Sequence, residues 1–377
     1  MANIYDIDYS ASNKDFVGEE VDDIDELFEV NEFSESNYAY IIDSQDYNIP
    51  AVTYDLLNNE VFTSASFKPF TIQTSTGTKS FNYGSLIIPL SVQKKLNSDE
   101  LYEKMKSIQK KYDVNIYSVE SGLSSSGVDL GSGYVMPLNK PSAMMLIGTG
   151  VRSYEAGEVW HLLDQRVGMP ITKVPMRNFD NISMDKYNVL VLVSGNYKFS
   201  DNQIEKIKTW AENGNTIISI GSGSKLLIDK KIVDENLLEK EESNAINYLA
   251  YGDARENRGK EQIGGVILNS IIDLSHPLAF GYENNTLPLY KNNSIWLKPS
   301  KNNYSSVVRY SDNSLIDGFL SENNKEKIKE SVSLVVSRVG RGIAVMFADN
   351  PNFRGAWYGT NRLFLNAIFL GDKIYIP

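Results

Sequence analysis

The sequence contains no cysteine among its 377 residues and only two histidines, His161 and His276. Without thiols the chain forms no disulfide, thiolate zinc site or iron–sulfur cluster, and it offers no cysteine nucleophile. No apolar run approaches the roughly 18 residues that a membrane span needs, which excludes an integral membrane protein. The acidic start MANIYDIDYS lacks an apolar segment, so no signal peptide is visible.

Basic residues are scarce in one part of the chain only. Residues 1–35 hold 12 acidic residues and one basic residue, so this leader alone accounts for the formal net charge of −11. The rest of the chain is neutral and therefore suits a phosphate backbone poorly, which predicts no nucleic-acid partner. We interpret the leader as a linker or wrapping arm. The apolar spacing within residues 18–33 is also compatible with a short amphipathic helix, whereas the calcium-loop pattern is absent.

Residues 36–138 predict a small α/β domain. Apolar, strand-like runs are found at 38–43, 61–67, 68–75, 85–90 and 114–119. One helix is expected to begin at Asn48, with Pro50 in its first turn, and a second is expected to be capped by Ser98. This alternation indicates a parallel or mixed sheet with helices packed on it. The Ser- and Gly-rich residues 121–134 are predicted to form a loop.

Residues 139–377 predict a larger α/β domain with an open sheet. Three strong apolar strands are expected at 142–148, 186–195 and 216–224, further strands, several of them antiparallel, within 264–282, 305–311, 330–340 and 342–350, and a closing helix at 361–370. Ser200 is expected to cap a helix that ends at Gly214. The polar residues 228–262 are predicted to form an exposed excursion.

A glycine turn follows the first of these strong strands. Gly148 and Gly150 stand between a strand and a helix, where backbone N–H groups can meet a phosphate. The dinucleotide fingerprint fails because Ser153 occupies its third glycine position, so a tight structural turn is favoured over a nucleotide site. We expect three side chains of this helix to point into the crevice above the sheet ends: Arg152, Tyr154 and Glu155.

A second glycine turn surrounds Ser222. The nucleophile elbow of serine hydrolases needs G-x-S-x-G, and this segment does not frame its serines in that way. An enzyme or small-ligand site in the crevice near Gly148, Glu155 and Ser222 is nevertheless an alternative hypothesis.

The two histidines suggest a zinc site as a second alternative. His161 is followed three residues later by Asp164, a spacing similar to the His-x-x-Glu of zinc peptidases, and His276 would be the distant ligand. We favour a packing role for His161 on a core-facing stripe, and a turn at His276 and Pro277.

The densest polar and aromatic cluster lies near the end of the chain. It contains Asp349, Arg354, Trp357 and Tyr358. Arg and aromatic side chains are enriched at recognition surfaces, so Arg354, Trp357 and Tyr358 are candidate ligand-binding residues. The favoured interpretation is a structural cap in which Arg354 pairs with Asp349.

Five stretches resemble the region downstream of the catalytic domain in large bacterial zinc carboxypeptidases. They are YGSLIIPL, SVESGLSSSGVDLGS, VRSYEAGEVWHLLDQRVGMP, DLSHPLAFGY and SRVGRGIAVMFADNPNFRGAWYGTNRLFLNAIF. The resemblance implies that the second unit is similar to class I glutamine amidotransferases, with a flavodoxin-like open sheet. That fold would carry a Cys at its elbow, where this sequence has Gly221, Ser222 and Gly223, so amidotransferase chemistry is not expected.

The resemblance also implies a context for the chain. A signal peptide and a zinc peptidase domain would precede this region, so the parent would be an exported metallocarboxypeptidase that acts on peptides. Zinc would belong to that domain, and no cofactor or catalytic residue is expected in this chain. Its expected partners are the peptidase domain and a peptide or protein. We therefore predict a non-catalytic accessory module.

Overall fold

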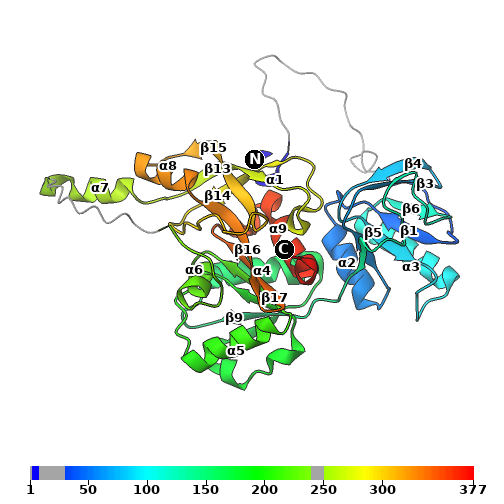
Figure 1. Cartoon of the computed structure of the whole chain (residues 1–377), viewed down its shortest axis with the longest axis horizontal. Coiled ribbons are helices and arrows are strands. Elements are labelled where there is room, and N and C mark those ends of the chain that lie inside the picture. The colour runs from blue at the N-terminus through cyan, green and yellow to red at the C-terminus, as the bar shows by residue number, and fades with distance from the viewer. Residues whose placement is uncertain (1, 8–29, 239–249) are drawn as a thin grey trace, which may run out of the picture.

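The computed structural model describes residues 2–7, 30–238 and 250–377 of the chain (Figure 1). The helix that the leader suggested within residues 18–33 lies almost wholly outside the described residues, as does the middle of the polar excursion at 228–262. The described part of that excursion includes α7 (Ala254–Lys260), which is exposed and projects from the body at the left of Figure 1.

The first part of the chain contains two antiparallel sheets. The larger has the order β6-β1-β5-β2-β8, with β1 (Ala39–Ile42), β2 (Ser64–Ser66), β5 (Leu86–Pro89), β6 (Ile116–Val119) and β8 (Val135–Pro137). The smaller has the order β4-β3-β7, with β3 (Phe70–Thr74), β4 (Gly77–Phe81) and β7 (Ser126–Gly127). The expected parallel or mixed sheet is therefore wrong, because every strand pair in these sheets is antiparallel.

Two helices accompany these sheets, α2 (Ile49–Asn58) and α3 (Ser98–Tyr112). Pro50 lies in the first turn of α2, as the sequence predicted, because its missing N–H has no helical partner there. The cap of α3 is Asn97 rather than Ser98. Its side chain accepts the Glu100 N–H, and the Glu100 side chain accepts the Asn97 N–H.

A nine-stranded sheet dominates the second part, with the order β10-β9-β11-β12-β17-β16-β15-β13-β14. Its parallel strands are β9 (Ala143–Ile147), β10 (Thr172–Pro175), β11 (Val189–Leu192), β12 (Thr216–Ile220) and β17 (Gly342–Phe347). Its antiparallel strands are β13 (Val266–Ile272), β14 (Thr286–Lys291), β15 (Ser306–Gly318) and β16 (Val332–Val339). This confirms the expected α/β open sheet with added antiparallel strands.

Helices connect and cover this sheet. They are α4 (Ser153–Trp160), α5 (Asp201–Glu212), α6 (Ser222–Asp229), α8 (Glu322–Lys329) and α9 (Tyr358–Leu370), and α4 continues into a π-helical turn, His161–Val167. Ser200 caps α5 as predicted, and Gly214 follows its end with φ 107°. A short helix at the other end of the chain, α1 (Ala2–Tyr5), lies against α9.

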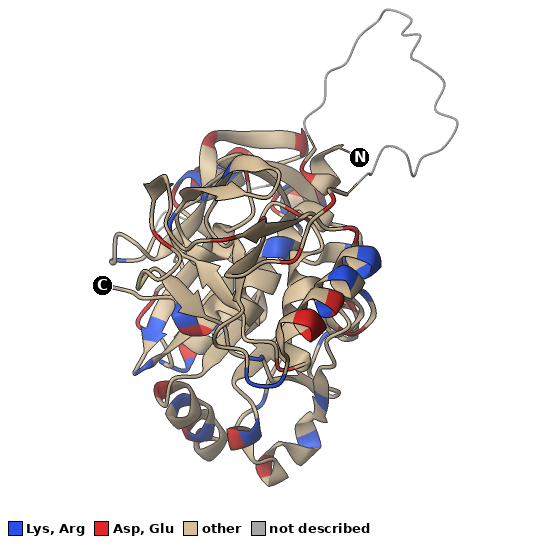
Figure 2. Cartoon of the chain, turned by 90° about the vertical axis from the view of Figure 1, so that its right-hand side faces the viewer, with Lys and Arg blue, Asp and Glu red and all other residues tan. Residues whose placement is uncertain are grey.

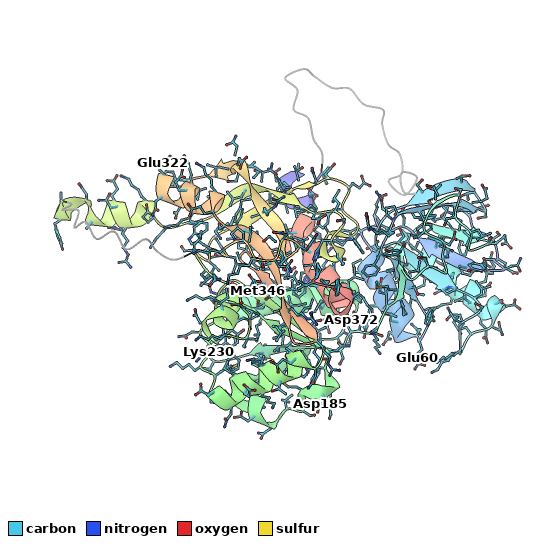
Figure 3. The ribbon with its side chains drawn as sticks, in the orientation of Figure 1. Glu60, Asp185, Lys230, Glu322, Met346 and Asp372 are labelled. Carbon is cyan, nitrogen blue, oxygen red and sulfur yellow. The ribbon has the colours of Figure 1, made fainter. Side chains whose placement is uncertain are left out.

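One apolar cluster joins the two parts of the chain. It runs from Tyr40 and Leu56 in the first part to Phe364 in α9, so the core is continuous across the domain boundary that was predicted after residue 138. Figure 3 shows Met346 inside the body, whereas Glu60 and Asp185 lie at its periphery. Lys and Arg are interspersed with Asp and Glu over the side shown in Figure 2. None of the described helices is long and apolar enough to cross a membrane.

Candidate functional site: the crevice at the ends of the parallel strands

The parallel strands define where a ligand would bind. In chain order they are β9, β10, β11, β12 and β17, so their spatial order reads 2-1-3-4-5, the flavodoxin-like arrangement. Ligands of such sheets bind outside the carboxyl ends of the strands. A cavity of about 200 Å³ lies there, lined by Arg152, Glu155, Ser194, Ile220, Gly221, Ser222, Asn292, Asn293, Ser294, Ile295 and Asn350. The structure thus brings three of the predicted residues together in one crevice: Arg152, Glu155 and Ser222.

Gly221 occupies the turn between β12 and α6. Its φ of 55° and ψ of −118° are conformations that a side chain rarely tolerates, and they produce the sharp strand-to-helix elbow on which hydrolases mount a nucleophile. A Cβ at this position would lie 2.4 Å from Ser194 Oγ, so even alanine would displace a neighbour. The elbow is therefore formed, but its reactive position carries no side chain.

Ser222, the next residue, is hydrogen-bonded to the backbone. Its hydroxyl accepts the Gly195 N–H at 2.8 Å and donates to the Gly195 carbonyl at 3.1 Å. Neither histidine lines the crevice, so the described lining offers Ser222 no imidazole as general base. The hydroxyl thus ties the loop after β11 to the first turn of α6.

Glu155 is the buried acid of the crevice. Its Oε2 accepts the Ser194 N–H at 2.8 Å, and its Oε1 lies 3.5 Å from Nη1 of Arg152, a side chain that is 68% exposed. Tyr154 was expected to point into the crevice but is 88% exposed and does not line it. Successive helix residues differ by about 100° in direction, so turning Glu155 inward directs Tyr154 toward solvent.

The end of β17 borders the crevice through Asn350. Its Nδ2 donates to Glu158 Oε2 at 2.6 Å, and the Arg354 N–H donates to Glu158 Oε1 at 2.7 Å. Burial raises the pKa of Glu158, although these two hydrogen bonds oppose the rise. Arg354 is exposed, and Asp349 forms its ion pair with Lys291, so the predicted pairing of Arg354 with Asp349 is wrong.

Asp349 instead lies at the centre of a buried polar network that the sequence did not predict. Its Oδ1 accepts from Lys291 Nζ at 2.9 Å, and its Oδ2 accepts from the hydroxyls of Tyr310 at 2.5 Å and Ser333 at 2.8 Å. Burial lowers the pKa of Lys291, against the effect of Asp349, and raises that of Tyr310. The sequence does contain a signal for the burial of Lys291, because this residue alternates with Leu287 and Leu289 on the buried face of one strand.

The loop after β14 links this network to the crevice. Lys291 also donates to the Ile295 carbonyl at 2.9 Å, and Asn293 Nδ2 donates to the Ala348 carbonyl at 2.9 Å. Asn293 and Ile295 both line the crevice. The network therefore fixes one wall of the crevice, and Lys291 itself does not line the cavity.

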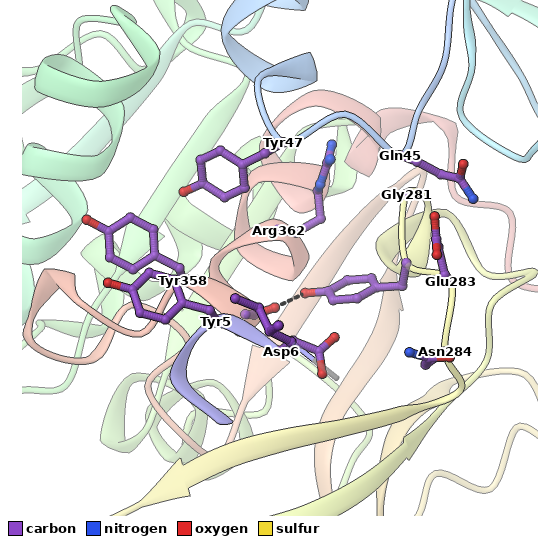
Figure 4. Close-up of a pocket in the computed structure, with 12 residues that line it drawn as sticks. Tyr5, Asp6, Gln45, Tyr47, Gly281, Glu283, Asn284, Tyr358 and Arg362 are labelled. Carbon is purple, nitrogen blue, oxygen red and sulfur yellow. Dashed lines mark hydrogen bonds between the residues drawn. The ribbon is translucent and has the colours of Figure 1, made fainter. Parts of the chain in front are cut away.

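The aromatic residues of the C-terminal cluster separate. Trp357 is buried and packs against Tyr290, with ring centroids 5.6 Å apart. Tyr358 lines a different cavity of about 680 Å³, between the first part of the chain and α9 (Figure 4). Arg354, Trp357 and Tyr358 therefore do not form a single binding lip.

The two histidines have different surroundings. His161 is exposed at the start of the π-helical turn, so its expected place on a core-facing stripe is wrong. His276 forms the predicted turn before Pro277, where its Nδ1 accepts the Leu278 N–H at 3.2 Å. Within the described ranges, no three His, Cys, Asp or Glu side chains are grouped as metal ligands would be.

Comparisons with known proteins give only structural neighbours. No family model and no curated protein matches the chain, so no sequence match links it to a carboxypeptidase. PurLQS from Thermotoga maritima is 15% identical, covers 60% of this chain and 96% of its own, and has a TM-score of 0.38. A ThuA-like protein from Parabacteroides merdae is 14% identical, with coverages of 62% and 90% and a TM-score of 0.42. A glutamine amidotransferase from Thermotoga maritima is 10% identical, with coverages of 56% and 76% and a TM-score of 0.34.

The strand order defines the fold as an α/β protein with a flavodoxin-like parallel core. One of the structural neighbours is a glutamine amidotransferase.

Proposed function

We propose that this chain is a non-catalytic accessory and interaction module. The observation that carries the proposal is Gly221, a residue without a side chain at the elbow position that would hold a nucleophile. The neighbouring hydroxyl of Ser222 is engaged with the backbone, and the sequence has no cysteine. The polar groups around the crevice hold loops in place, which suits a scaffold better than a hydrolase.

The proposal includes a parent protein, an exported zinc carboxypeptidase-like enzyme in which zinc belongs to a separate peptidase domain. Support comes from the five resembling stretches, of which the longest is SRVGRGIAVMFADNPNFRGAWYGTNRLFLNAIF. The reading frame upstream of the codon for Ala2 tests this part directly. We expect it to encode a contiguous domain with a His-x-x-Glu motif, and a frame without such a domain would refute the assigned parent.

The non-catalytic role is tested on the chain alone. We would incubate it with unblocked peptides and with L-glutamine, with and without added Zn²⁺, and measure released amino acids and ammonia. Neither product should exceed the protein-free blank. Zinc-dependent release of C-terminal residues, or release of ammonia, would overturn the proposal. A secreted carboxypeptidase of known activity serves as the positive control for the peptide assay.

Binding of a small zwitterion is a second candidate function, favoured by the opposite charges of Arg152 and Glu155 at the 200 Å³ crevice. L-glutamine is a suitable probe, because its carboxylate could meet Arg152 and its ammonium group could meet Glu155. If the crevice binds it, calorimetry should detect a saturable signal that Arg152→Ala weakens at least about tenfold. A chain that shows no heat at millimolar L-glutamine does not use the crevice in this way.

A further inference from the structure

The first described residues of the chain lie on the first turn of α9 (Figure 4). The ring of Tyr5 stacks on that of Tyr358, with centroids 5.0 Å apart and planes 22° apart. Asp6 approaches Gly359 so closely that a Cβ on this glycine would lie 2.9 Å from Asp6 Cβ and 3.0 Å from Asp6 N. Residues 2–7 are therefore seated on a surface that fits them, and Gly359 is required for the fit.

The surface under this segment is aromatic and includes a guanidinium group. The guanidinium of Arg166 lies 4.0 Å from the ring centroid of Tyr358 and 5.3 Å from that of Tyr47. Tyr282 donates its hydroxyl proton to the Gly359 carbonyl at 2.7 Å. Stacked aromatic and guanidinium groups of this kind form recognition platforms for an aromatic side chain.

The cavity of about 680 Å³ beside the segment adds a positive charge. Arg362 lines it, is buried, and donates through Nη2 to the backbone carbonyls of Ser44 and Asp46. A buried guanidinium favours a negatively charged group in its neighbourhood. Asp6 lines the same cavity, so the seated segment brings an acid directly after its aromatic residue.

We propose that the groove formed by Tyr47, Tyr282, Tyr358, Gly359 and Arg362 is a peptide-docking site. Its ligand class is a short segment with an aromatic residue followed by an acid, and residues 2–7 of this chain are its occupant. Tyr5 remains 45% exposed, so the contact is shallow and relies on being intramolecular. A partner peptide of the same class at sufficient concentration therefore displaces the segment. This site is separate from the crevice and does not depend on the role of Gly221.

Spin labelling of the full chain tests the proposal. Because the sequence has no cysteine, Ile7→Cys gives a single labelling site, at a residue that is 59% exposed. We expect the motion of the label to be restricted in the chain that carries Ile7→Cys alone. Gly359→Ala should release it, because the three nearest atoms to the new Cβ all belong to Tyr5 and Asp6, while alanine favours the helix itself. The matched control is Gly157→Ala in α4, where nothing lies within 4 Å of the new Cβ.

The peptide arm uses acetyl-Ala-Asn-Ile-Tyr-Asp-Ile-amide added to the labelled chain. We expect it to mobilise the label at millimolar concentration, and the version with alanine in place of tyrosine to be at least about fivefold weaker. Tyr5→Ala in the chain should mobilise the label without any peptide. A label that is equally mobile with and without Gly359→Ala would overturn the proposal. So would a label whose motion becomes more restricted as the protein concentration rises, if the protein also has a dimeric mass. In that case a second copy of the chain would supply the segment.

Discussion

Two aspartates in different parts of the chain accept nearly the same set of hydrogen bonds. Asp55 in α2 accepts from Lys104 at 2.6 Å, Lys111 at 2.7 Å and Tyr112 at 2.9 Å. Asp349 after β17 accepts from one lysine and two hydroxyls, all of them buried. The chemistry is alike, but the lysines differ: Lys291 is 0% exposed, whereas Lys104 and Lys111 are 22% and 59% exposed.

This difference assigns the two clusters different roles. Water reaches both Lys104 and Lys111 whether or not Asp55 is present, so the loss of Asp55 should cost less stability than the loss of Asp349. Lys291 has no access to water, and among the described residues Asp349 is the carboxylate with which it forms an ion pair. The Asp349 cluster is therefore expected to matter more for the stability of the nine-stranded sheet than the Asp55 cluster. It also supports one wall of the crevice.

The largest expected effect is that of Asp349→Asn. The substitution leaves the Lys291 cation buried without a carboxylate, which should lower the free energy of unfolding by about 3–5 kcal/mol. Urea denaturation measures the loss. Ser333→Ala, which removes one neutral donor to the same carboxylate, should cost only about 1 kcal/mol. If the two variants lowered the free energy of unfolding equally, the ion pair between Lys291 and Asp349 would contribute no more than a neutral hydrogen bond.

A pH titration around His276 comes next, since this half-buried group makes no ion pair with any of the described residues. Burial lowers the pKa of His276 to about 4, against the effect of Asp273. The unfolded chain binds the proton near pH 6.5, so stability is complete above that pH and falls as the pH drops toward 4. We expect a loss of about 1–2 kcal/mol in this window that is absent in His276→Gln. An imidazole resonance of His276 that titrates near pH 6.5 in the folded protein would contradict this.

Asp55 should show a smaller effect at lower pH. Burial alone would raise its pKa, but the hydrogen bonds from Lys104, Lys111 and Tyr112 outweigh it and lower the pKa to about 2. Its contribution is therefore present above about pH 4 and is lost as the pH falls from 4 to 2. Asp55→Asn should lower the free energy of unfolding by about 1 kcal/mol at pH 7. It should also reduce the pH dependence of that free energy between pH 4 and pH 2. A cost as large as that of Asp349→Asn would abolish the distinction between the clusters.

An exposed ion pair sets the lower limit of this comparison. On α6, Lys225 Nζ lies 2.9 Å from Asp229 Oδ2, and the two side chains are 46% and 49% exposed. Lys225→Ala should change the free energy of unfolding by less than about 0.5 kcal/mol, and high salt should remove the difference. A larger, salt-independent loss in urea denaturation would show that exposure is a poor guide to these clusters.

The sequence predicted the parts of the fold that local signals determine. Ser200, the apolar spacing after it and Gly214 define α5 because caps and helical periodicity act within a few residues. The strands β9, β11 and β12 were recognisable as continuous apolar runs. The direction of pairing in the first part was not, because antiparallel and parallel neighbours are chosen by contacts between segments far apart in the chain.

The site was predicted only where it follows a strand directly. Glu155 and Ser222 lie in the crevice because each belongs to the first turn of a helix that follows a parallel strand. The network of Asp349 could not be assembled in advance, since its donors come from positions 58, 39 and 16 residues away on three strands. Arg354, the predicted partner of Asp349, is its neighbour in the sequence but forms no ion pair with it among the described contacts.

The central claim is that the crevice holds no activated nucleophile. The most direct measurement is intact-protein mass spectrometry after treatment with a fluorophosphonate, which modifies activated serines. We predict no adduct on the native chain, because Ser222 is bound to Gly195 and no imidazole lines the crevice. A stoichiometric adduct that maps to Ser194, Ser222 or Ser224 in the native protein, and disappears on unfolding, would contradict the claim.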